Sequence, residues 1–107
     1  MTDIHDTIKD QVKQNRVVLY MKGTPQFPQC GFSATVAEVL KRCGVTDYKS
    51  FNVLQDDALR QGIKEYSNWP TIPQVYIHGK FVGGCDIVQE LAERGELEAL
   101  VKETRSP

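Results

Sequence analysis

Residues 17–34 read VVLYMKGTPQFPQCGFSA, and this stretch predicts the centre of the fold. Val17–Met21 is a short, almost entirely apolar run, which is typical of a strand buried on both faces of a sheet. Residues 22–29 contain a glycine and two prolines and indicate a loop. Cys30 follows, just before an apolar pattern of helical period. The stretch therefore predicts a central strand and a loop that brings a cysteine to the start of a helix.

The predicted helix begins near Cys30 or Gly31 and has one apolar face. Four residues at helical spacing form that face: Val36, Val39, Leu40 and Cys43. Gly44 is a natural end for the helix. The pattern places Cys43 in the core, because free cysteine is among the most buried residue types.

Four further helices and three further strands are predicted. Short polar side chains cap helices, so we expect Thr2 or Asp3, Asp56 or Asp57, and Asp86 to begin three of them. The strands are residues 48–53, Gln74–Ile77 and residues 81–82, and the last helix covers residues 96–103. The inward-facing positions of these helices share helical spacing: Ile4, Ile8 and Val12; Leu59, Ile63 and Tyr66; Ile87 and Leu91; Leu97, Leu100 and Val101.

The order of elements is α-β-α-β-α-β-β-α-α, which predicts an α/β fold. The first two strands should be parallel with a right-handed crossover, and the last two should form an antiparallel hairpin. Together they make a four-stranded mixed sheet flanked by helices on both faces. The length of 107 residues favours a single domain, residues 1–107.

Composition excludes several classes of function. The net charge is −1, and no basic stripe indicates nucleic acid or an anionic membrane surface. No apolar run approaches the roughly 20 residues of a membrane span. The N-terminal sequence MTDIHDTIKD lacks the order of a secretory signal. Three cysteines, an odd number, do not suggest a disulfide scaffold. We expect a reducing compartment, the cytoplasm.

Cys30 is the strongest candidate for chemistry. At a helix start, free N–H groups and the positive end of the helix dipole favour a thiolate. Lys22, at the end of the first strand, should lie in the same region and lower the pKa of the thiol further. The alternative is a buried, inert cysteine, but Gly31 and the proline-rich loop favour exposure.

The other candidates have plain structural readings. Cys85 lies at a strand-to-helix junction beside two glycines, and a buried junction residue is as good a reading as a functional one. Trp69 is more typical of structural support than of ligand contact. His5 and His78 are expected to be solvated. No cysteine and histidine pair has zinc-finger spacing.

Taken together, four segments of the chain resemble the monothiol glutaredoxins of the CGFS type. They are Lys22; Cys30-Gly31-Phe32-Ser33; Trp69-Pro70-Thr71-Ile72-Pro73-Gln74; and Gly83-Gly84-Cys85-Asp86. The segments occur in this order over nearly the whole chain. The resemblance implies a thioredoxin-like fold, which agrees with the predicted order of elements, and a cis peptide bond before Pro73.

The resemblance also implies a glutathione site. Lys22 and Arg60 would meet the glycine carboxylate, and the backbone of Ile72 would pair with the cysteinyl unit. The helix start at Cys85 and Asp86 would bind the γ-glutamyl carboxylate through N–H groups, while the Asp86 side chain meets the amine. The remaining residues that the resemblance adds to this site are Gly31, Phe32, Thr71, Pro73 and Gly84.

Two functions fit the resemblance. In the first, the protein carries a 2Fe–2S cluster between two subunits, ligated by Cys30 of each subunit and by two glutathiones, since four thiolates are needed. In the second, Cys30 attacks the glutathionyl sulfur of a mixed disulfide and a second glutathione resolves the adduct, with Cys85 as an internal resolving partner. The family is generally poor at this reaction, so the first function is favoured and enzymatic activity is expected to be weak. A glutathione-binding adaptor is a third option.

The implied partners also come from the resemblance. They are glutathione, a second copy of the chain when the cluster is bound, a BolA-type protein in mixed dimers, cluster-assembly scaffolds and apo acceptor proteins. The isolated chain without a cluster is expected to be a monomer. Ser33 stands where a second thiol would resolve a disulfide, and its hydroxyl can instead satisfy a free backbone N–H.

Overall fold

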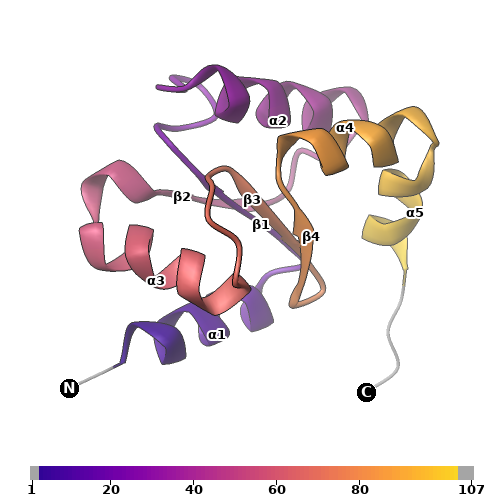
Figure 1. The fold of residues 1–107 in the computed structure, drawn as a ribbon. Helices are drawn as coiled ribbons and strands as arrows, with labels where there is room; N and C mark the ends of the chain where they lie inside the picture. The colour runs from indigo at the N-terminus through magenta and orange to yellow at the C-terminus, as the bar shows by residue number, and fades with distance from the viewer. Residues whose placement is uncertain (1–2, 104–107) are drawn as a thin grey trace.

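A four-stranded mixed sheet lies at the centre of the computed structural model, which describes residues 3–103 (Figure 1). The strands are β1 (Val17–Met21), β2 (Lys49–Asn52), β3 (Gln74–Ile77) and β4 (Lys80–Gly83), in the spatial order β2-β1-β3-β4. β1 runs parallel to β2 and antiparallel to β3, and β3 runs antiparallel to β4. The predicted mixed sheet is confirmed.

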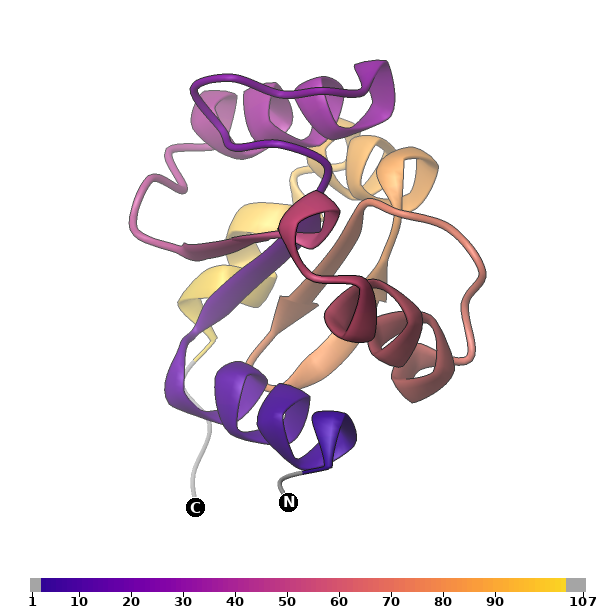
Figure 2. The same ribbon diagram turned by 90° about the vertical axis from the view of Figure 1, so that its left-hand side faces the viewer.

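Helices cover both faces of this sheet. Figures 1 and 2 show α2 and α4 on one face and α1 and α3 on the other. The helices are α1 (Ile4–Gln14), α2 (Gly31–Arg42), α3 (Asp57–Ser67), α4 (Cys85–Glu93) and α5 (Glu96–Lys102). A short 3-10 helix, η1 (Val53–Gln55), joins β2 to α3. No helix among residues 3–103 combines the length and the apolar character needed to cross a bilayer.

The almost entirely apolar sequence of β1 explains this layered arrangement. Every residue of β1 is buried, and alternate side chains point to opposite faces. Val17, Leu19 and Met21 join one core cluster with α2, α4 and α5, whereas Val18 and Tyr20 join the other with α1 and α3. The strand is therefore the shared wall of two cores.

Two of the predicted helix caps are confirmed and one is wrong. Asp3 accepts a hydrogen bond from the N–H of His5 at 2.9 Å, and Asp56 accepts one from the N–H of Leu59 at 3.0 Å. Thr2, the alternative cap of α1, lies outside the described residues. Asp86 caps nothing, because α4 begins one residue earlier, at Cys85, with Gly84 as its N-cap.

A close backbone approach places the start of α4. A Cβ at position 84 would lie 3.2 Å from the carbonyl oxygen of Pro73, which is closer than an ordinary contact. Gly84 can therefore sit against the segment before β3, and the helix starts directly after it. Asp86 is left exposed in the first turn of α4, where its charge still meets the positive end of the helix dipole.

The second strand is shorter than the predicted residues 48–53. The Asn52 side chain accepts hydrogen bonds from the N–H of Leu54 at 3.0 Å and from the N–H of Gly23 at 2.9 Å. These bonds turn the chain into η1 at Val53. Since Gly23 belongs to the loop after β1, a contact between distant segments ends the strand.

Three side chains lie differently from the prediction. Tyr66 is 36% exposed, because the buried face of α3 centres on Leu59, Gly62 and Ile63. Ile87 is also 36% exposed, and Val88 is the buried residue of α4. His78 is not fully solvated, since its Nε2 is buried without a hydrogen-bond partner among residues 3–103. Its backbone N–H donates to the carbonyl of Arg16 at 2.8 Å, which holds the turn inward.

His5 agrees better with the prediction of a solvated side chain. Its ring is 44% exposed and lies 3.2 Å from the Glu65 carboxylate.

The different roles of Asp56 and Asp86 give a stability prediction. Asp56→Ala should lower the free energy of unfolding by about 1 kcal/mol, because it removes a cap hydrogen bond. Asp86→Ala should cost about 0.3 kcal/mol, because only an exposed charge near the helix dipole is lost. Urea unfolding of both variants in the same buffer measures the difference. An equal loss for both would contradict the assignment of Gly84 as the cap.

Candidate functional site

A folded loop brings Cys30 to the end of β1. Gly23 and Pro28 form a β-bridge, and the N–H of Gln29 donates to the carbonyl of Lys22 at 2.9 Å. Gly23 has φ of +89°, and a Cβ there would collide with the carbonyl of Phe27, so only glycine allows this closure. The loop therefore doubles back and places Cys30 beside Lys22 as the N-cap of α2.

The surroundings of Cys30 favour its thiolate. The backbone N–H of Ser33 lowers the pKa of the thiol most, and partial burial acts in the opposite direction. The N–H of Phe32, the ammonium of Lys22 and the Ser33 hydroxyl add to the lowering. Cys30 is only partly buried and lines a pocket, so the alternative of a buried cysteine is wrong. The helix start contributes more than the lysine because its N–H groups point at the sulfur.

Ser33 also has a structural role. It is fully buried, and its Oγ accepts a hydrogen bond from the N–H of Lys22 at 3.1 Å. The expectation that this hydroxyl satisfies a free backbone N–H is confirmed, but the N–H belongs to the end of β1 rather than to the helix. Ser33 thus fixes the first turn of α2 against the strand that carries Lys22.

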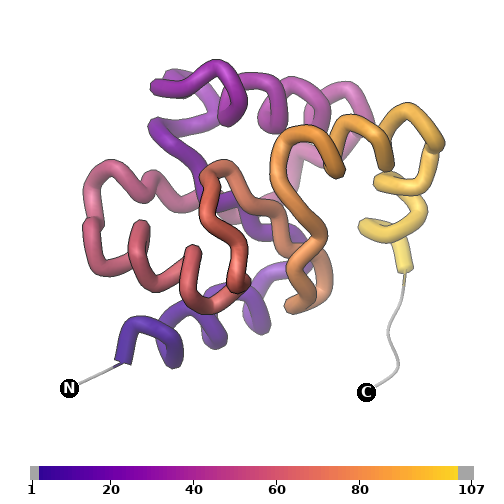
Figure 3. The backbone as a smooth tube through the Cα atoms, viewed as in Figure 1, coloured from indigo at the N-terminus to yellow at the C-terminus, as the bar shows by residue number. Residues whose placement is uncertain are grey.

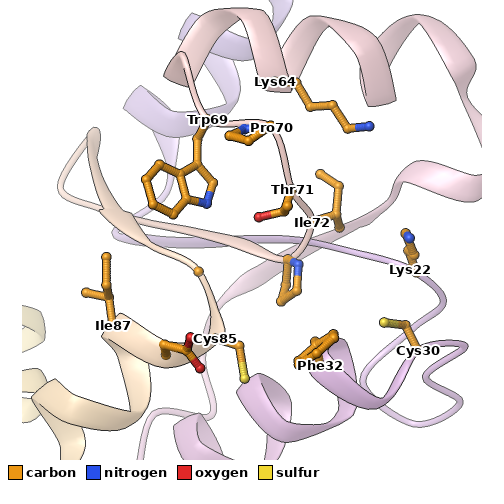
Figure 4. A pocket seen from close by; sticks show the side chains of 13 residues that line it. Lys22, Cys30, Phe32, Lys64, Trp69, Pro70, Thr71, Ile72, Cys85 and Ile87 are labelled. Atoms are coloured by element: carbon orange, nitrogen blue, oxygen red, sulfur yellow. The ribbon is translucent and has the colours of Figure 1, made fainter.

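Cys30 opens onto a pocket of about 490 Å³ (Figure 4). The pocket lies between the starts of α2 and α4 and the crossing loop, the segment of residues 68–73 that leads from α3 to β3 and can be followed in Figure 3. Its lining comes from four parts of the chain: Lys22, Cys30 and Phe32; Lys64; Trp69, Pro70, Thr71, Ile72 and Pro73; Gly84, Cys85, Asp86 and Ile87.

Nine of the eleven predicted site residues line this pocket. They are Lys22, Cys30, Phe32, Thr71, Ile72, Pro73, Gly84, Cys85 and Asp86. Gly31 and Arg60 are not among the lining residues. Gly31 is exposed at the start of α2, and Arg60 lies one turn before the position on α3 that reaches the pocket.

Lys64 is the lining cation that sequence reasoning missed. It stands four residues after Arg60 in α3, so both side chains lie on one side of the helix. The spacing of four residues could have indicated Lys64 as a second candidate. The sequence could not show, however, which turn of α3 lies against the pocket.

The two sides of the pocket differ in charge. Figure 4 shows Lys64 and Lys22 on one side and Cys85 and Ile87 on the other, with Cys30 and Phe32 along the edge between them. The carboxylate of Asp86 and the N-terminus of α4 belong to the second side. An elongated ligand with an anionic end near the lysines and a zwitterionic end near α4 would match these charges.

The crossing loop presents backbone at the centre of the pocket. The Ile72–Pro73 peptide bond is cis, which confirms what the resemblance implied. The Ile72 side chain is only 6% exposed and belongs to the core on the α1 and α3 face. Its N–H and C=O form no hydrogen bond in the turns and loops between residues 3 and 103, which leaves them available to a ligand.

Trp69 supports this loop and also lines the pocket. The indole is 37% exposed and lies 5.9 Å from the ring of Phe81, centroid to centroid. A Cβ at position 84 would lie 3.5 Å from the indole nitrogen, so Trp69 also reaches the start of α4.

The other two cysteines differ from Cys30. Burial, together with the negative charges of Asp86 and of a Cys30 thiolate, raises the pKa of Cys85. Burial and Glu98 raise the pKa of Cys43, which is partly buried and packs against the core as predicted. All three thiols are free. Among residues 3–103, no cluster of three or more His, Cys, Asp or Glu side chains could hold a metal ion.

These features define a thioredoxin-like protein with one cysteine of lowered pKa beside a cis-proline loop. The glutaredoxin family model matches residues 17–82, so the chain belongs to the glutaredoxin family. The probable monothiol glutaredoxin 2 of Rickettsia typhi is 52% identical over 90% of this chain and 86% of the relative. Within the family, the chain groups with the monothiol glutaredoxins.

Solved structures agree on the fold. Reduced apo GrxS14 of poplar superposes with a TM-score of 0.77 at 52% identity, covering 91% of this chain and 88% of that one. The buckwheat glutaredoxin–glutathione complex superposes with a TM-score of 0.80 at 26% identity, covering 92% and 86% of the two chains. The predicted thioredoxin-like fold is confirmed.

Alkylation should single out Cys30. Because its pKa is lowered and those of Cys43 and Cys85 are raised, iodoacetamide near neutral pH should modify Cys30 first. Lys22→Met should move the midpoint of the rate-against-pH curve to higher pH, since removal of the ammonium destabilises the thiolate. Mass spectrometry of digests at several pH values measures each rate. Lys64→Met, which removes a pocket lysine that does not act on the Cys30 pKa, should leave the midpoint in place.

Proposed function

We propose that the protein is a monothiol glutaredoxin that binds glutathione in the pocket at Cys30 and carries a 2Fe–2S cluster as cargo between two subunits. The observation that supports this most is a cysteine of lowered pKa in a pocket with lysines at one end and a helix start at the other. Glutathione is a ligand of the glutaredoxin family. The two carboxylates, the amine and the thiol of glutathione are complementary to that arrangement.

The charges suggest one orientation for glutathione. The glycine carboxylate would lie between Lys22 and Lys64, and the backbone of Ile72 would pair with the cysteinyl unit as in strand addition. The γ-glutamyl carboxylate would accept hydrogen bonds from the N–H groups that begin α4, while Asp86 meets the amine. The sulfur of glutathione would then lie beside Cys30.

Mutating the lysines tests this orientation. Lys22→Met or Lys64→Met should weaken glutathione binding roughly tenfold, because each removes a charge-assisted hydrogen bond to a carboxylate. Arg60→Met should have little effect, since Arg60 lies outside the pocket lining. Isothermal titration at low salt measures all three. A larger loss for Arg60→Met than for Lys64→Met would instead support the pairing of Lys22 with Arg60.

The donor set suits a shared cluster. Four thiolates are required, and each subunit would supply Cys30 and one bound glutathione. The absence of a second cysteine at position 33 favours this function, because a thiol there could close a disulfide with Cys30 and withdraw the ligand. A small-molecule ligand and a small interface make the cargo labile, which suits delivery to an acceptor. Ser33 instead supports the thiolate and holds α2 to β1.

Anaerobic reconstitution with iron, sulfide and glutathione tests the carrier function. The wild type should become coloured and should elute as a dimer, whereas Cys30→Ser should stay colourless. Cys43→Ser is the matched control and should keep the colour, since Cys43 packs against the core far along α2 from the pocket. A colourless wild-type monomer would exclude the proposal.

A glutathione-dependent oxidoreductase is the alternative. The Cys30 thiolate would attack the glutathionyl sulfur of a mixed disulfide, release the other thiolate and become glutathionylated. The thiolate of a second glutathione would then attack the glutathionyl sulfur of this adduct, release the Cys30 thiolate and form glutathione disulfide. The lowered pKa of Cys30 and the presence of Cys85 in the same pocket favour this chemistry. If the protein reduced a disulfide substrate with glutathione at ordinary enzyme rates, about 1–1,000 per second, oxidoreductase activity would be its main function.

The remaining expectations depend on the carrier function. A cluster-bound chain would be a homodimer or pair with a BolA-type protein, and it would receive its cargo from an assembly scaffold and deliver it to acceptors. Without cargo we expect a monomer. The cytoplasm stays our expectation for its location.

A further inference from the structure

Gln74 is the one large polar side chain among the fully buried residues of the described chain apart from tyrosines. It is the first residue of β3 and has no exposed surface. Side chains alternate along a strand, so Gln74 points to the same face as Tyr76, the face covered by α1 and α3. The crossing loop comes from α3 on this face and ends at Pro73, directly before Gln74.

Among residues 3–103, the amide of Gln74 forms hydrogen bonds only with the crossing loop. Its Nε2 donates to the carbonyl of Trp69 at 3.1 Å and to the carbonyl of Thr71 at 3.2 Å. Within residues 3–103, no backbone N–H in the turns and loops donates to either carbonyl. One buried side chain therefore donates to both of these loop carbonyls.

The other end of the amide shows that these two bonds determine its orientation. Oε1 of Gln74 is buried without a hydrogen-bond partner among the described residues. Rotating the amide by half a turn would place Oε1 against two carbonyl oxygens and leave all three without a donor. The chain therefore retains an unpaired acceptor in order to hold two loop carbonyls inward.

These contacts bear directly on the pocket. Trp69 and Thr71 both line it, and Ile72, whose backbone is available to a ligand, stands between Thr71 and Pro73. The N–H of Trp69 donates to Ser67 Oγ at 3.1 Å, so the start of the loop is fixed from the side of α3 as well. Because the Trp69 indole also reaches Gly84, movement of the loop would disturb the start of α4, which lines the pocket as well.

We propose that Gln74 is a positioning residue: its buried amide holds the crossing loop, residues 68–73, in the form that presents the backbone of Ile72 to glutathione. The inference rests on the proposed glutathione site. Gln74 itself touches no ligand, since it is not among the residues that line the pocket. Its effect on binding comes from the fraction of molecules in which the loop has the binding form.

Gln74→Met tests this role, because methionine keeps the length and bulk of the side chain but removes the donor. Loss of both hydrogen bonds should reduce the population of the binding form and weaken glutathione binding roughly tenfold. Trp69 is the only tryptophan, so its fluorescence reports on the loop itself. We expect a shifted emission maximum in Gln74→Met and a larger change in emission on adding glutathione than in the wild type.

Tyr20→Phe is the matched control. Tyr20 pairs with Gln74 in the sheet, is also fully buried, and donates from its hydroxyl to Gln11 Oε1 at 2.7 Å, away from the pocket. This variant should lose thermal stability as Gln74→Met does, but should keep the glutathione affinity and the Trp69 emission of the wild type. A loss of stability alone therefore cannot imitate the positioning role.

The outcomes separate this inference from the proposed function. If the wild type does not bind glutathione, the proposed function fails and the inference fails with it. If the wild type binds and Gln74→Met binds equally well with unchanged Trp69 emission, only the inference is overturned. If Gln74→Met does not fold, Gln74→Asn, which keeps an amide one methylene too short to reach both carbonyls, is measured instead. Wild-type affinity in that folded variant would equally overturn the role.

Discussion

Burial of β1 on both faces is the constraint on which the rest of the structure depends. All five residues of β1 are buried, with side chains on both faces of the sheet. Both faces can be shielded from water only if a layer of helices covers each of them. The same burial fixes β1 in the interior, with β2 on one side and β3 on the other. The loop that follows Met21 therefore begins at an interior strand and not at an edge strand of the sheet. For this reason Lys22 and Cys30 lie near the middle of the sheet.

Strand direction then gathers the site. β1 ends where β3 begins, because the two strands are antiparallel and Tyr20 pairs with Gln74. β3 is in turn antiparallel to β4, and Val75 pairs with Gly83. The end of β1, the start of β3 and the end of β4 therefore meet at one edge of the sheet. Each of these strand ends is followed or preceded by a loop or a helix start. These segments supply the Cys30 thiol, the unpaired backbone of Ile72 and the N–H groups that begin α4.

Hydrogen bonds between side chains and backbone keep these irregular segments in place where no regular structure does. Ser33 joins α2 to the end of β1, Asn52 joins the loop at Gly23 to η1, and Gln74 joins the crossing loop to β3. All three are short polar or amide side chains that satisfy backbone groups which no helix or sheet can reach. The thiolate of Cys30 depends on this support, because its pKa is lowered chiefly by N–H groups that must point at the sulfur.

The sequence by itself determined the order of the elements, the mixed sheet, the single candidate thiol and most of the pocket lining. Apolar period, glycine and proline positions and helix starts are local, and Val17–Met21, Asp3 and Asp56 act through neighbours in the chain. Only the tertiary structure decided that Gly84 caps α4, that Lys64 rather than Arg60 lines the pocket, and that Gln74 supports the crossing loop. The first two depend on the distance between segments far apart in sequence, which no local pattern encodes. The third involves neighbours in the chain, but the Gln74 amide meets the carbonyls of Trp69 and Thr71 only because the loop folds back toward the start of β3.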